Sequence, residues 1–292
     1  MYLSKYIKDH FLALLLNVLM LSFAFGVLFP QGGLAAETDW QGNDKSQLRL
    51  IAAPAVWQGK AHIFAGIEIK LAPEWKTYWR TPGDTGIPPY FDWTGSENLK
   101  KAEVLYPAPV RFKDPGGSSI GYKRSVILPV VLVPRDPSQP VRLKLDANYA
   151  ICHDLCVPVE AQHTLLIKRD DGVHNAPLIE MALGDVPSPR QSLIDDFGVE
   201  KVALQQVSGV KFLEFNLKVP AEAEGLELFI EGPDGLYVPT PQLVSDRAPI
   251  QGAVTFAVDL SKVDDAQMVT KAALICTLKV KRRAIVQPCP LR

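Results

Sequence analysis

Apolar and polar residues alternate along several stretches of the chain, and this alternation predicts β-strands. From Ala61 to Leu71 the odd-numbered positions are apolar, while most of the even-numbered ones are polar. The same alternation runs from Val141 to Tyr149, where the residues between the apolar positions are Arg, Lys, Asp and Asn. A period of two residues is typical of a strand with one buried face. The sequence therefore predicts strands over 61–71 and 141–149.

Other stretches extend this all-β pattern. The apolar run 126–133 is interrupted only by Pro129, and it predicts a strand buried on both faces with the proline at an edge or a bulge. Further strands are expected over 161–168, near Val202 and Phe212, and over 226–230, 253–258, 272–280 and 284–287. Turn signals such as the Gly-Pro-Asp-Gly run at 232–235 separate them. Short strands at this spacing predict β-sandwiches.

A change in composition divides the chain into two predicted domains. The segment 170–192 contains Asp171-Gly172 and a short helical pattern around 178–183 that is followed by Pro187 and Pro189, and we interpret it as a linker with a short helix. The first sandwich is then expected over 37–169 and the second over 193–292. A chain of 292 residues suits two domains of ordinary size.

The first 36 residues have the layout of a secretory signal peptide. Lys5 and Lys8 precede an uncharged apolar run over 11–29, and small residues follow at Ala35 and Ala36. This layout predicts export, with cleavage after Ala36. The apolar run is also long enough to span a bilayer, so a retained anchor stays an alternative. Both alternatives place the rest of the chain outside the cytoplasm.

Composition and the remaining side chains exclude several classes of function. Hydrophobic residues make up 47% of the chain, which is enough for a real core. Lys and Arg number 31 against 32 Asp and Glu, so there is no electrostatic reason to expect a nucleic-acid partner. No Ser–His–Asp set, phosphate loop or nucleotide fingerprint is present. The aromatic cluster of Trp75, Tyr78 and Trp79 is expected to pack in the core, with a partner-docking patch as the alternative.

The pair Cys152 and Cys156 lies between two predicted strands. Two residues four apart in a straight strand are ~13 Å apart, whereas a disulfide needs Cα atoms within about 7 Å. The pair can bond only if residues 153–155 turn the chain back. A five-residue loop contributes only ~2 kcal/mol as a staple, against ~3 kcal/mol for fifteen residues, so a redox role is favoured over a structural one.

A metal site is a weaker alternative for the same stretch, with His153 and His163 as additional ligands. Cys152 and His153 are adjacent in the chain, and adjacent ligands fit a tetrahedral cage badly. His163 has the same parity as the apolar positions of its predicted strand, which is typical of a buried histidine that packs rather than binds a metal. We therefore expect no metal and no cofactor.

Several segments resemble a known family. They are Glu-Trp-Lys-Thr-Tyr-Trp-Arg-Thr-Pro-Gly-Asp-Thr-Gly at 74–86, Phe-Asp-Trp-Thr-Gly-Ser at 91–96, Ser-Ile-Gly-Tyr at 119–122, Leu-Pro-Val at 128–130, and the cysteine stretch at 149–158. In this order, over about 52–167, they resemble the periplasmic N-terminal domain of the thiol:disulfide interchange protein DsbD and of its ScsB-type relatives. The resemblance implies an immunoglobulin-like sandwich with the cysteine pair at one end. The membrane and thioredoxin-like domains of DsbD are not expected within these 292 residues.

The resemblance also implies roles for individual residues. Cys156 would form the mixed disulfide with a partner, and Cys152 would resolve it. A cap loop shields the pair in DsbD, and the matching segment here is 112–118, which has proline and glycines where the family has an aromatic residue. Phe112, Asp114 and Tyr122 are then the residues expected to cap the pair.

The remaining two cysteines, Cys276 and Cys289, are expected to form a structural disulfide. The segments 272–280 and 284–287 read as a hairpin, and a turn centred on Arg282-Arg283 would put the two cysteines directly opposite each other. Opposed residues of a non-hydrogen-bonded pair have Cα atoms ~4.5 Å apart, which permits a bridge.

Together these observations predict a periplasmic thiol–disulfide exchange protein made of two immunoglobulin-like sandwiches. By the resemblance, it would pass reducing equivalents from a membrane-embedded thiol reductase to periplasmic disulfide-containing proteins, and it would meet the membrane only through its export signal. The sequence leaves open whether the protein is an enzyme. The alternative is a non-catalytic binding module with structural disulfides, which docks a partner or captures copper.

Overall fold

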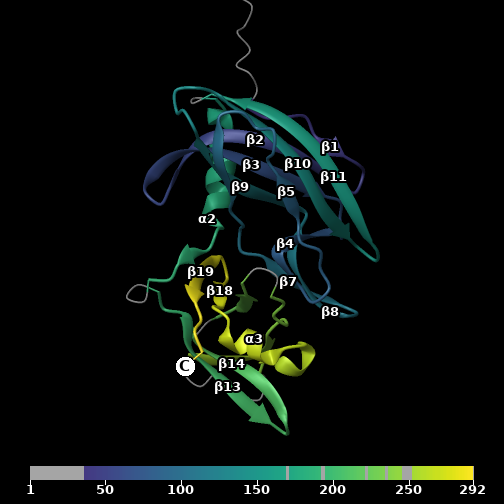
Figure 1. Ribbon diagram of the computed structural model, residues 1–292, viewed down its shortest axis with the longest axis vertical. Helices are drawn as coiled ribbons and strands as arrows, with labels where there is room; N and C mark the ends of the chain where they lie inside the picture. The colour runs from purple at the N-terminus through teal and green to yellow at the C-terminus, as the bar shows by residue number, and fades with distance from the viewer. Residues whose placement is uncertain are drawn as a thin grey trace, which may run out of the picture. The chain divides into compact units, whose positions relative to one another are not determined.

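The computed structural model of the protein describes residues 36–168, 171–191, 195–220, 223–233, 236–244 and 252–291. The predicted signal peptide, apart from Ala36, lies outside these residues. The described part is almost entirely β-structure, arranged as two sandwiches joined by a short helical segment (Figure 1). This confirms the all-β prediction. Within the described residues, no helix is both long and apolar enough to cross a membrane.

The first sandwich consists of two mainly antiparallel sheets. One sheet has the order β1-β2-β3-β9-β6 and the other has the order β11-β10-β4-β8-β7, with β5 paired to β10. The strands, listed in chain order, are β1 Gln41–Gly42, β2 Ser46–Trp57, β3 Lys60–Leu71, β4 Lys76–Gly83, β5 Tyr90–Asp92, β6 Leu99–Val104, β7 Val110–Asp114, β8 Gly117–Lys123, β9 Ser125–Pro134, β10 Val141–Cys152 and β11 Cys156–Ile167.

The core explains why the period of two was readable in the sequence. Alternate residues of β3, such as Ile67 and Ile69, and of β10, such as Leu143 and Leu145, are buried in the core between the sheets. Burying an aliphatic side chain of this size stabilises the fold by about 1.5–3 kcal/mol. The alternating faces therefore lock the register of both strands.

The predicted linker contributes to the first sandwich. Its helix α2, Ala176–Gly184, begins with a proline in its first turn and follows the 3₁₀ turn η1, Val173–Asn175. Ile179 of the helix is fully buried against Ile51 and Phe64, on the face of β2 and β3 that points away from the central core. The helix covers this face, which would otherwise expose apolar residues to water.

Pro129 lies inside β9, between β3 and β6, and the expectation of an edge strand or a bulge at this position is wrong. The pairing with β3 passes through Pro129 and Gly66 without a shift. The Leu105 amide, just beyond the end of β6, donates to the Pro129 carbonyl at 2.7 Å. Because the nitrogen and oxygen of one strand residue point to the same side, the proline nitrogen faces the end of β6, where the ladder needs no donor.

The second sandwich has two four-stranded sheets, β12-β19-β18-β15 and β13-β14-β17-β16. Its elements are β12 Ser188–Pro189, β13 Gly198–Val207, β14 Val210–Lys218, β15 Glu227–Glu231, β16 Gln242–Leu243, β17 Ala253–Asp259, η2 Leu260–Lys262, α3 Ala266–Lys271, β18 Ile275–Val280 and β19 Arg283–Pro288. Helix α3 was not expected from the sequence; its first turn is capped by the side chain of Asp265. The strand predicted over 272–280 begins only at Ile275, after this helix.

The last hairpin has a different register from the predicted one. Val280 pairs with Arg283, so the turn consists of Lys281 and Arg282 and Cys276 lies opposite Gln287. Lys281 adopts a left-handed backbone conformation with φ 54°, which a tight two-residue turn requires. Cys289 follows the end of β19 and is not a strand partner of Cys276.

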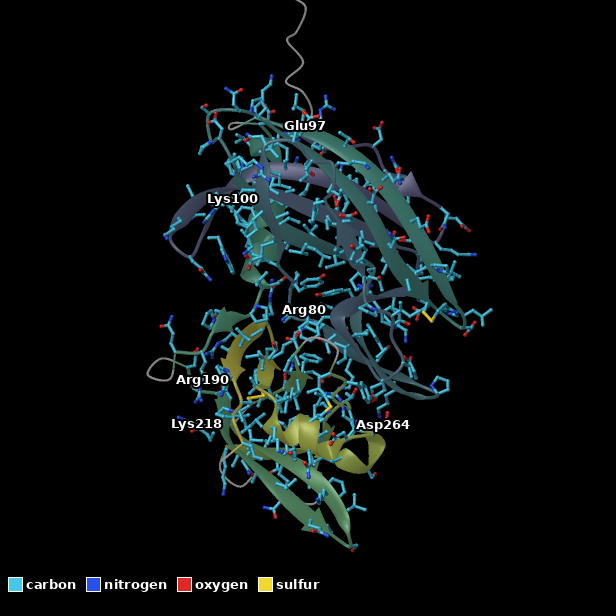
Figure 2. The ribbon with its side chains drawn as sticks, viewed as in Figure 1. Arg80, Glu97, Lys100, Arg190, Lys218 and Asp264 are labelled. Carbon is cyan, nitrogen blue, oxygen red and sulfur yellow. A yellow bond between two sulfur atoms is a disulfide. The ribbon has the colours of Figure 1, made fainter. Side chains whose placement is uncertain are left out.

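Polar and aromatic contacts join the two sandwiches. Arg80, labelled in Figure 2, donates two hydrogen bonds to the carboxylate of Glu231 at 2.7 and 2.8 Å. Trp79 and Phe229, both fully buried, have ring centroids 5.7 Å apart. Arg111 donates to the backbone carbonyls of Leu228 and Pro241. These contacts all involve β4, which pairs with the cysteine-bearing strand β10, or β7, the edge strand of the same sheet.

Candidate functional site

The cysteine pair lies at the tip of the long β10–β11 hairpin. Cys152 is the last residue of β10 and Cys156 is the first of β11, and the two are direct cross-strand partners. Their Cα atoms are 4.1 Å apart and their sulfurs form a disulfide, drawn in yellow at the end of this hairpin in Figure 2. Residues 153–155 turn the chain back, and the His153 amide donates to the Leu155 carbonyl at 3.3 Å. The turn that bonding requires is therefore present.

The two sulfur-bearing residues differ in their access to solvent. Cys152 is only 2% exposed, whereas Cys156 is exposed. Between them, Leu155 is 78% exposed, and His153 pairs with Asp154 at 2.9 Å on the outside of the loop. A partner can therefore reach Cys156 directly, while Cys152 lies behind it.

Strand β4 supplies the side chains next to the disulfide. Lys76 is the cross-strand partner of Cys152, and directly paired residues share a face of the sheet. Tyr78, two residues further along β4, lies on the same face. Its hydroxyl donates to the sulfur of Cys152 at 2.6 Å and lies 3.3 Å from the sulfur of Cys156. Tyr78 is thus the residue in hydrogen-bond contact with both sulfurs.

The β7–β8 hairpin contacts Lys76, and through it lies next to the cysteine pair. The ammonium of Lys76 forms an ion pair with Asp114 and donates to the hydroxyl of Ser119 at 3.0 Å. It also lies 5.3 Å from the ring centroid of Phe112, within the range of a cation–π interaction. Phe112 and Asp114 therefore lie beside the cysteine pair, one side chain removed from it.

Asp114 and Tyr78, next to the cysteine pair, have pKa values shifted in opposite directions. Burial opposes ionisation of Asp114, but hydrogen bonds from Lys76, Ser119 and Thr85 outweigh it and lower the pKa of this carboxyl group. Burial, followed by the nearby charge of Asp114, raises the pKa of Tyr78. The tyrosine therefore keeps its proton at neutral pH and remains a hydrogen-bond donor.

Tyr122 does not fit the predicted capping role. It pairs with Thr77, which in turn pairs with Ile151, so these residues share the face of the sheet opposite to that of Cys152. Its hydroxyl donates to the Pro107 carbonyl at 2.8 Å, and its ring is buried in the core of the first sandwich. The two faces of β8 could not be assigned from the sequence, because Gly121 and Lys123 on either side of Tyr122 obscure the alternation.

The three aromatic residues of β4 and its preceding turn have three different environments. Trp79 is fully buried in the core, as expected for packing. Trp75 is only partly buried and lies 6.0 Å from the ring of His153 in the cysteine loop. Tyr78 contacts the sulfurs. Alternation along β4 separates Tyr78 from Trp79, but the sequence does not say which face the cysteines share.

Two glycines make room for Tyr78. A Cβ at Gly86 would lie 2.8 Å from Cδ1 of Tyr78, and one at Gly121, the cross-strand partner of Tyr78, would lie 2.8 Å from its Cα. Contacts this short are not tolerated by side chains. These two positions therefore hold the tyrosine between the 84–86 loop and strand β8.

The other cysteines and the candidate metal ligands lie elsewhere. Cys276 and Cys289 form a disulfide with Cα atoms 6.0 Å apart, and both are buried in the core of the second sandwich. His163 is seven residues along β11 from Cys156, which is about 23 Å, and its Nδ1 hydrogen bonds with Thr38 at 2.9 Å. Among the described residues, no group of three or more His, Cys, Asp or Glu side chains could hold a metal ion.

This β-sandwich has a solvent-accessible disulfide at the tip of a hairpin. The arrangement fits a thiol–disulfide exchange domain better than a metal-binding module. Residues 48–168 match the family model of the N-terminal domain of the thiol:disulfide interchange protein DsbD. This match includes both cysteines of the pair, Lys76, Tyr78 and the β7–β8 hairpin, so the first sandwich is a domain of this family.

A solved structure extends the fold comparison to both sandwiches. The crystal structure of the N-terminal periplasmic domain of ScsB from Proteus mirabilis is similar with a TM-score of 0.65 and 20% sequence identity, covering 88% of this chain and 100% of that one. At this identity the likeness concerns the fold. No curated protein matches the sequence.

Proposed function

We propose that the protein is a periplasmic thiol–disulfide exchange protein that passes reducing equivalents between a membrane-embedded thiol reductase and periplasmic protein disulfides through Cys152 and Cys156. One observation carries the proposal: the disulfide closes a very short loop at a hairpin tip, with one cysteine exposed and the other buried. Such a bond adds little as a staple, and it is open to exchange.

The difference in exposure supports an order of events. Exchange requires a thiolate to approach a disulfide sulfur in line with the bond that breaks. Cys156 is the sulfur that a protein partner can approach, and Cys152 is 2% exposed. In this proposal Cys156 forms the mixed disulfide and Cys152 resolves it. Phe112 and Asp114 border the pair and act by holding Lys76, rather than by covering Cys156.

The proposed location requires an export signal, and the position of Ala36 favours cleavage one residue earlier than predicted. Ala36 is fully buried, and its carbonyl accepts hydrogen bonds from the Ala52 amide at 2.6 Å and the Asn175 side chain at 3.2 Å. Cleavage after Ala35 keeps these contacts and places small residues, Gly33 and Ala35, at the two positions that a signal peptidase recognises. N-terminal sequencing of the exported protein should begin at Ala36, and a start at Glu37 would refute this assignment.

A trapping experiment tests the function. In a Cys152→Ala variant, Cys156 attacks a partner disulfide but nothing resolves the product, so mixed disulfides should accumulate. The Cys156→Ala variant is the matched control, because its one remaining thiol of the pair is buried. Reductant-sensitive adducts in the periplasm with the first variant and none with the second are expected. Equal adducts from both variants, or none from either, would contradict the proposal.

A redox titration separates this function from the alternative of a binding module with structural disulfides. An exchange pair should equilibrate with glutathione at potentials of about −180 to −300 mV, whereas a structural pair should resist reduction over this range. Copper capture by the cysteine pair and both histidines is not favoured, because His163 is about 23 Å away along β11.

A further inference from the structure

The hydroxyl of Tyr78 distinguishes between the two sulfurs of the pair. It donates to Cys152 at 2.6 Å and is 3.3 Å from Cys156. Tyr78 is 3% exposed and packs with Ala150 and Cys152 in a small buried cluster separate from the main core. The closer hydrogen bond is therefore made to the buried sulfur, which a partner cannot reach.

The buried sulfur is the one that must accept charge during exchange. When a thiolate attacks Cys156, the electron pair of the broken bond is left on Cys152. A buried thiolate without a hydrogen-bond donor would be costly, and exchange is faster when the leaving thiol has a lower pKa. A donor already aimed at Cys152 meets both requirements, since a hydrogen bond to an anion is about twice as strong as a neutral one.

We propose that Tyr78 is a catalytic residue whose hydroxyl holds the leaving thiolate of Cys152. The inference rests on the proposed function. The partner thiolate forms a bond with the sulfur of Cys156, the Cys152–Cys156 bond breaks, and its electron pair remains on Cys152 as a thiolate hydrogen bonded by Tyr78. In the second half, a second thiolate of the partner attacks the partner sulfur of the mixed disulfide, the partner's own disulfide forms, and Cys156 leaves as a thiolate. In the reverse direction, Cys152 attacks the Cys156 sulfur of a mixed disulfide, the Cys152–Cys156 bond reforms, and the partner leaves as a thiolate.

Other charged groups near Cys152 are already paired. Lys76 shares the face of Cys152, but its ammonium is committed to Asp114 and Ser119. Lys123, the cross-strand partner of Lys76, lies near Glu74 at 3.9 Å and near the ring of Phe112. His153 pairs with Asp154. Tyr78 is therefore the donor whose bond is made to the sulfur itself.

The test compares two Tyr→Phe variants that remove one buried hydroxyl each. Tyr78→Phe removes the donor to Cys152. Tyr149→Phe is the matched control, because its hydroxyl is also buried in the first sandwich but hydrogen bonds with Ser46 at 2.8 Å. With reduced glutathione as the probe, Tyr78→Phe should slow reduction of Cys152–Cys156 about tenfold, while Tyr149→Phe should leave the rate unchanged. Titration of thiolate absorbance in the reduced proteins should show a raised pKa for Cys152 only in Tyr78→Phe.

The outcomes separate the two proposals. If the wild-type protein does not exchange with glutathione at all, the proposed function fails. If it exchanges and Tyr78→Phe matches it in rate and in thiolate titration, only the role of Tyr78 fails. Should Tyr78→Phe not fold, the near-ultraviolet absorbance of tyrosine in the reduced wild-type protein gives a second measurement. This absorbance should shift as Cys152 ionises, and a titration without a shift would overturn the proposal.

Discussion

The two disulfides of this protein are chemically the same bond in opposite surroundings. Cys152–Cys156 closes a loop of sequence separation 4 at a hairpin tip, and one of its cysteines is exposed. Cys276–Cys289 has a sequence separation of 13 and joins β18 to the chain that follows β19, with both cysteines at most 2% exposed. The first bond lies outside the main core of its sandwich, whereas the second is part of the core.

Loop length alone predicts only a small difference between the stabilising contributions of the two bonds. In the chain-entropy model, loops of five and fourteen residues contribute about 2 and about 3 kcal/mol, a difference of about 1 kcal/mol. The two bonds differ far more in how accessible their sulfurs are to a partner, and exchange needs direct approach to a sulfur. The comparison shows that the surroundings, more than the spacing of the cysteines, distinguish the two bonds.

The largest expected effect is selective reduction. Under native conditions mild reductant should open Cys152–Cys156 and leave Cys276–Cys289 intact, because the second sandwich must first open to expose its bond. Alkylation followed by mass mapping should label only Cys152 and Cys156. The same treatment in denaturant is the control, and it should label all four cysteines. Native labelling of Cys276 or Cys289 at a similar rate would remove the distinction.

Deleting the two bonds should affect stability in the opposite order: the bond that is harder to reduce should contribute more to the free energy of unfolding. Cys276→Ala with Cys289→Ala should lower the free energy of unfolding by about 3 kcal/mol, and Cys152→Ala with Cys156→Ala by about 2 kcal/mol or less. Urea unfolding without reductant measures both. If the hairpin-tip bond costs more to remove than the core bond, it is a staple, and the argument from loop size is wrong.

The fold was largely predictable because it depends on a local pattern. Alternation along β3 and β10 identified both strands, since one of their faces packs in the core. The position of Pro129 was not predictable in the same way, because it depends on where the neighbouring strand β6 ends. The register of the last hairpin failed for a related reason: Lys281 takes a left-handed conformation that its residue type does not signal.

The site was predictable in part. The cysteines and their need for a turn followed from spacing, whereas the contact from Tyr78 depends on the pairing of β4 with β10, two strands far apart in sequence. Pairing of this kind fixes which face of β4 meets the sulfurs. The sequence therefore identified the cysteine pair, but only the sheet order identified the donor beside it and placed Tyr122 on the opposite face of the sheet.

Asp84 links the surroundings of the first disulfide to the sandwich that holds the second. Its carboxylate accepts hydrogen bonds from the Ser118 amide of β8 at 2.9 Å and, in the second sandwich, from the Tyr237 hydroxyl at 2.8 Å and from the amide and hydroxyl of Thr240 at 3.0 and 2.9 Å. In Asp84→Asn the charge is lost and an amide donor faces other donors, so the free energy of unfolding should fall by about 1.5 kcal/mol.

A matched control tests whether this effect belongs to the interface. Asp136 also accepts from an amide and a hydroxyl, but both belong to Ser138 in the same turn, so Asp136→Asn should cost less. Burial opposes ionisation of Asp84, yet these hydrogen bonds lower its pKa below the ordinary 3.8. The stabilisation is thus present above pH 3.8 and is lost as the pH falls through the lower folded value. Equal costs for the two variants would show that Asp84 does not couple the sandwiches.

At mildly acidic pH we expect a last and smaller difference between the two sandwiches, in their stability. All five histidines of the chain lie at or before His174, so the second sandwich has none. His163, in the first sandwich, is 3% exposed and paired with Leu145 across β10 and β11. Burial lowers its pKa from the ordinary 6.5, and a backbone hydrogen bond at Leu48 opposes this only in part.

The first sandwich should therefore lose stability before the second as the pH falls. Above pH 6.5 His163 is neutral in both states, and its contribution is fully present. Below that value the unfolded chain takes up a proton that the folded chain resists, so stability declines until the pH passes the folded pKa. Amide hydrogen exchange at about pH 7.5 and about pH 5.5, corrected for intrinsic rates, should show weaker protection in β10 and β11 at the lower pH and unchanged protection in β14 and β18. His163→Gln should abolish this difference, and a decline that persists in the variant would assign the acid sensitivity to another group.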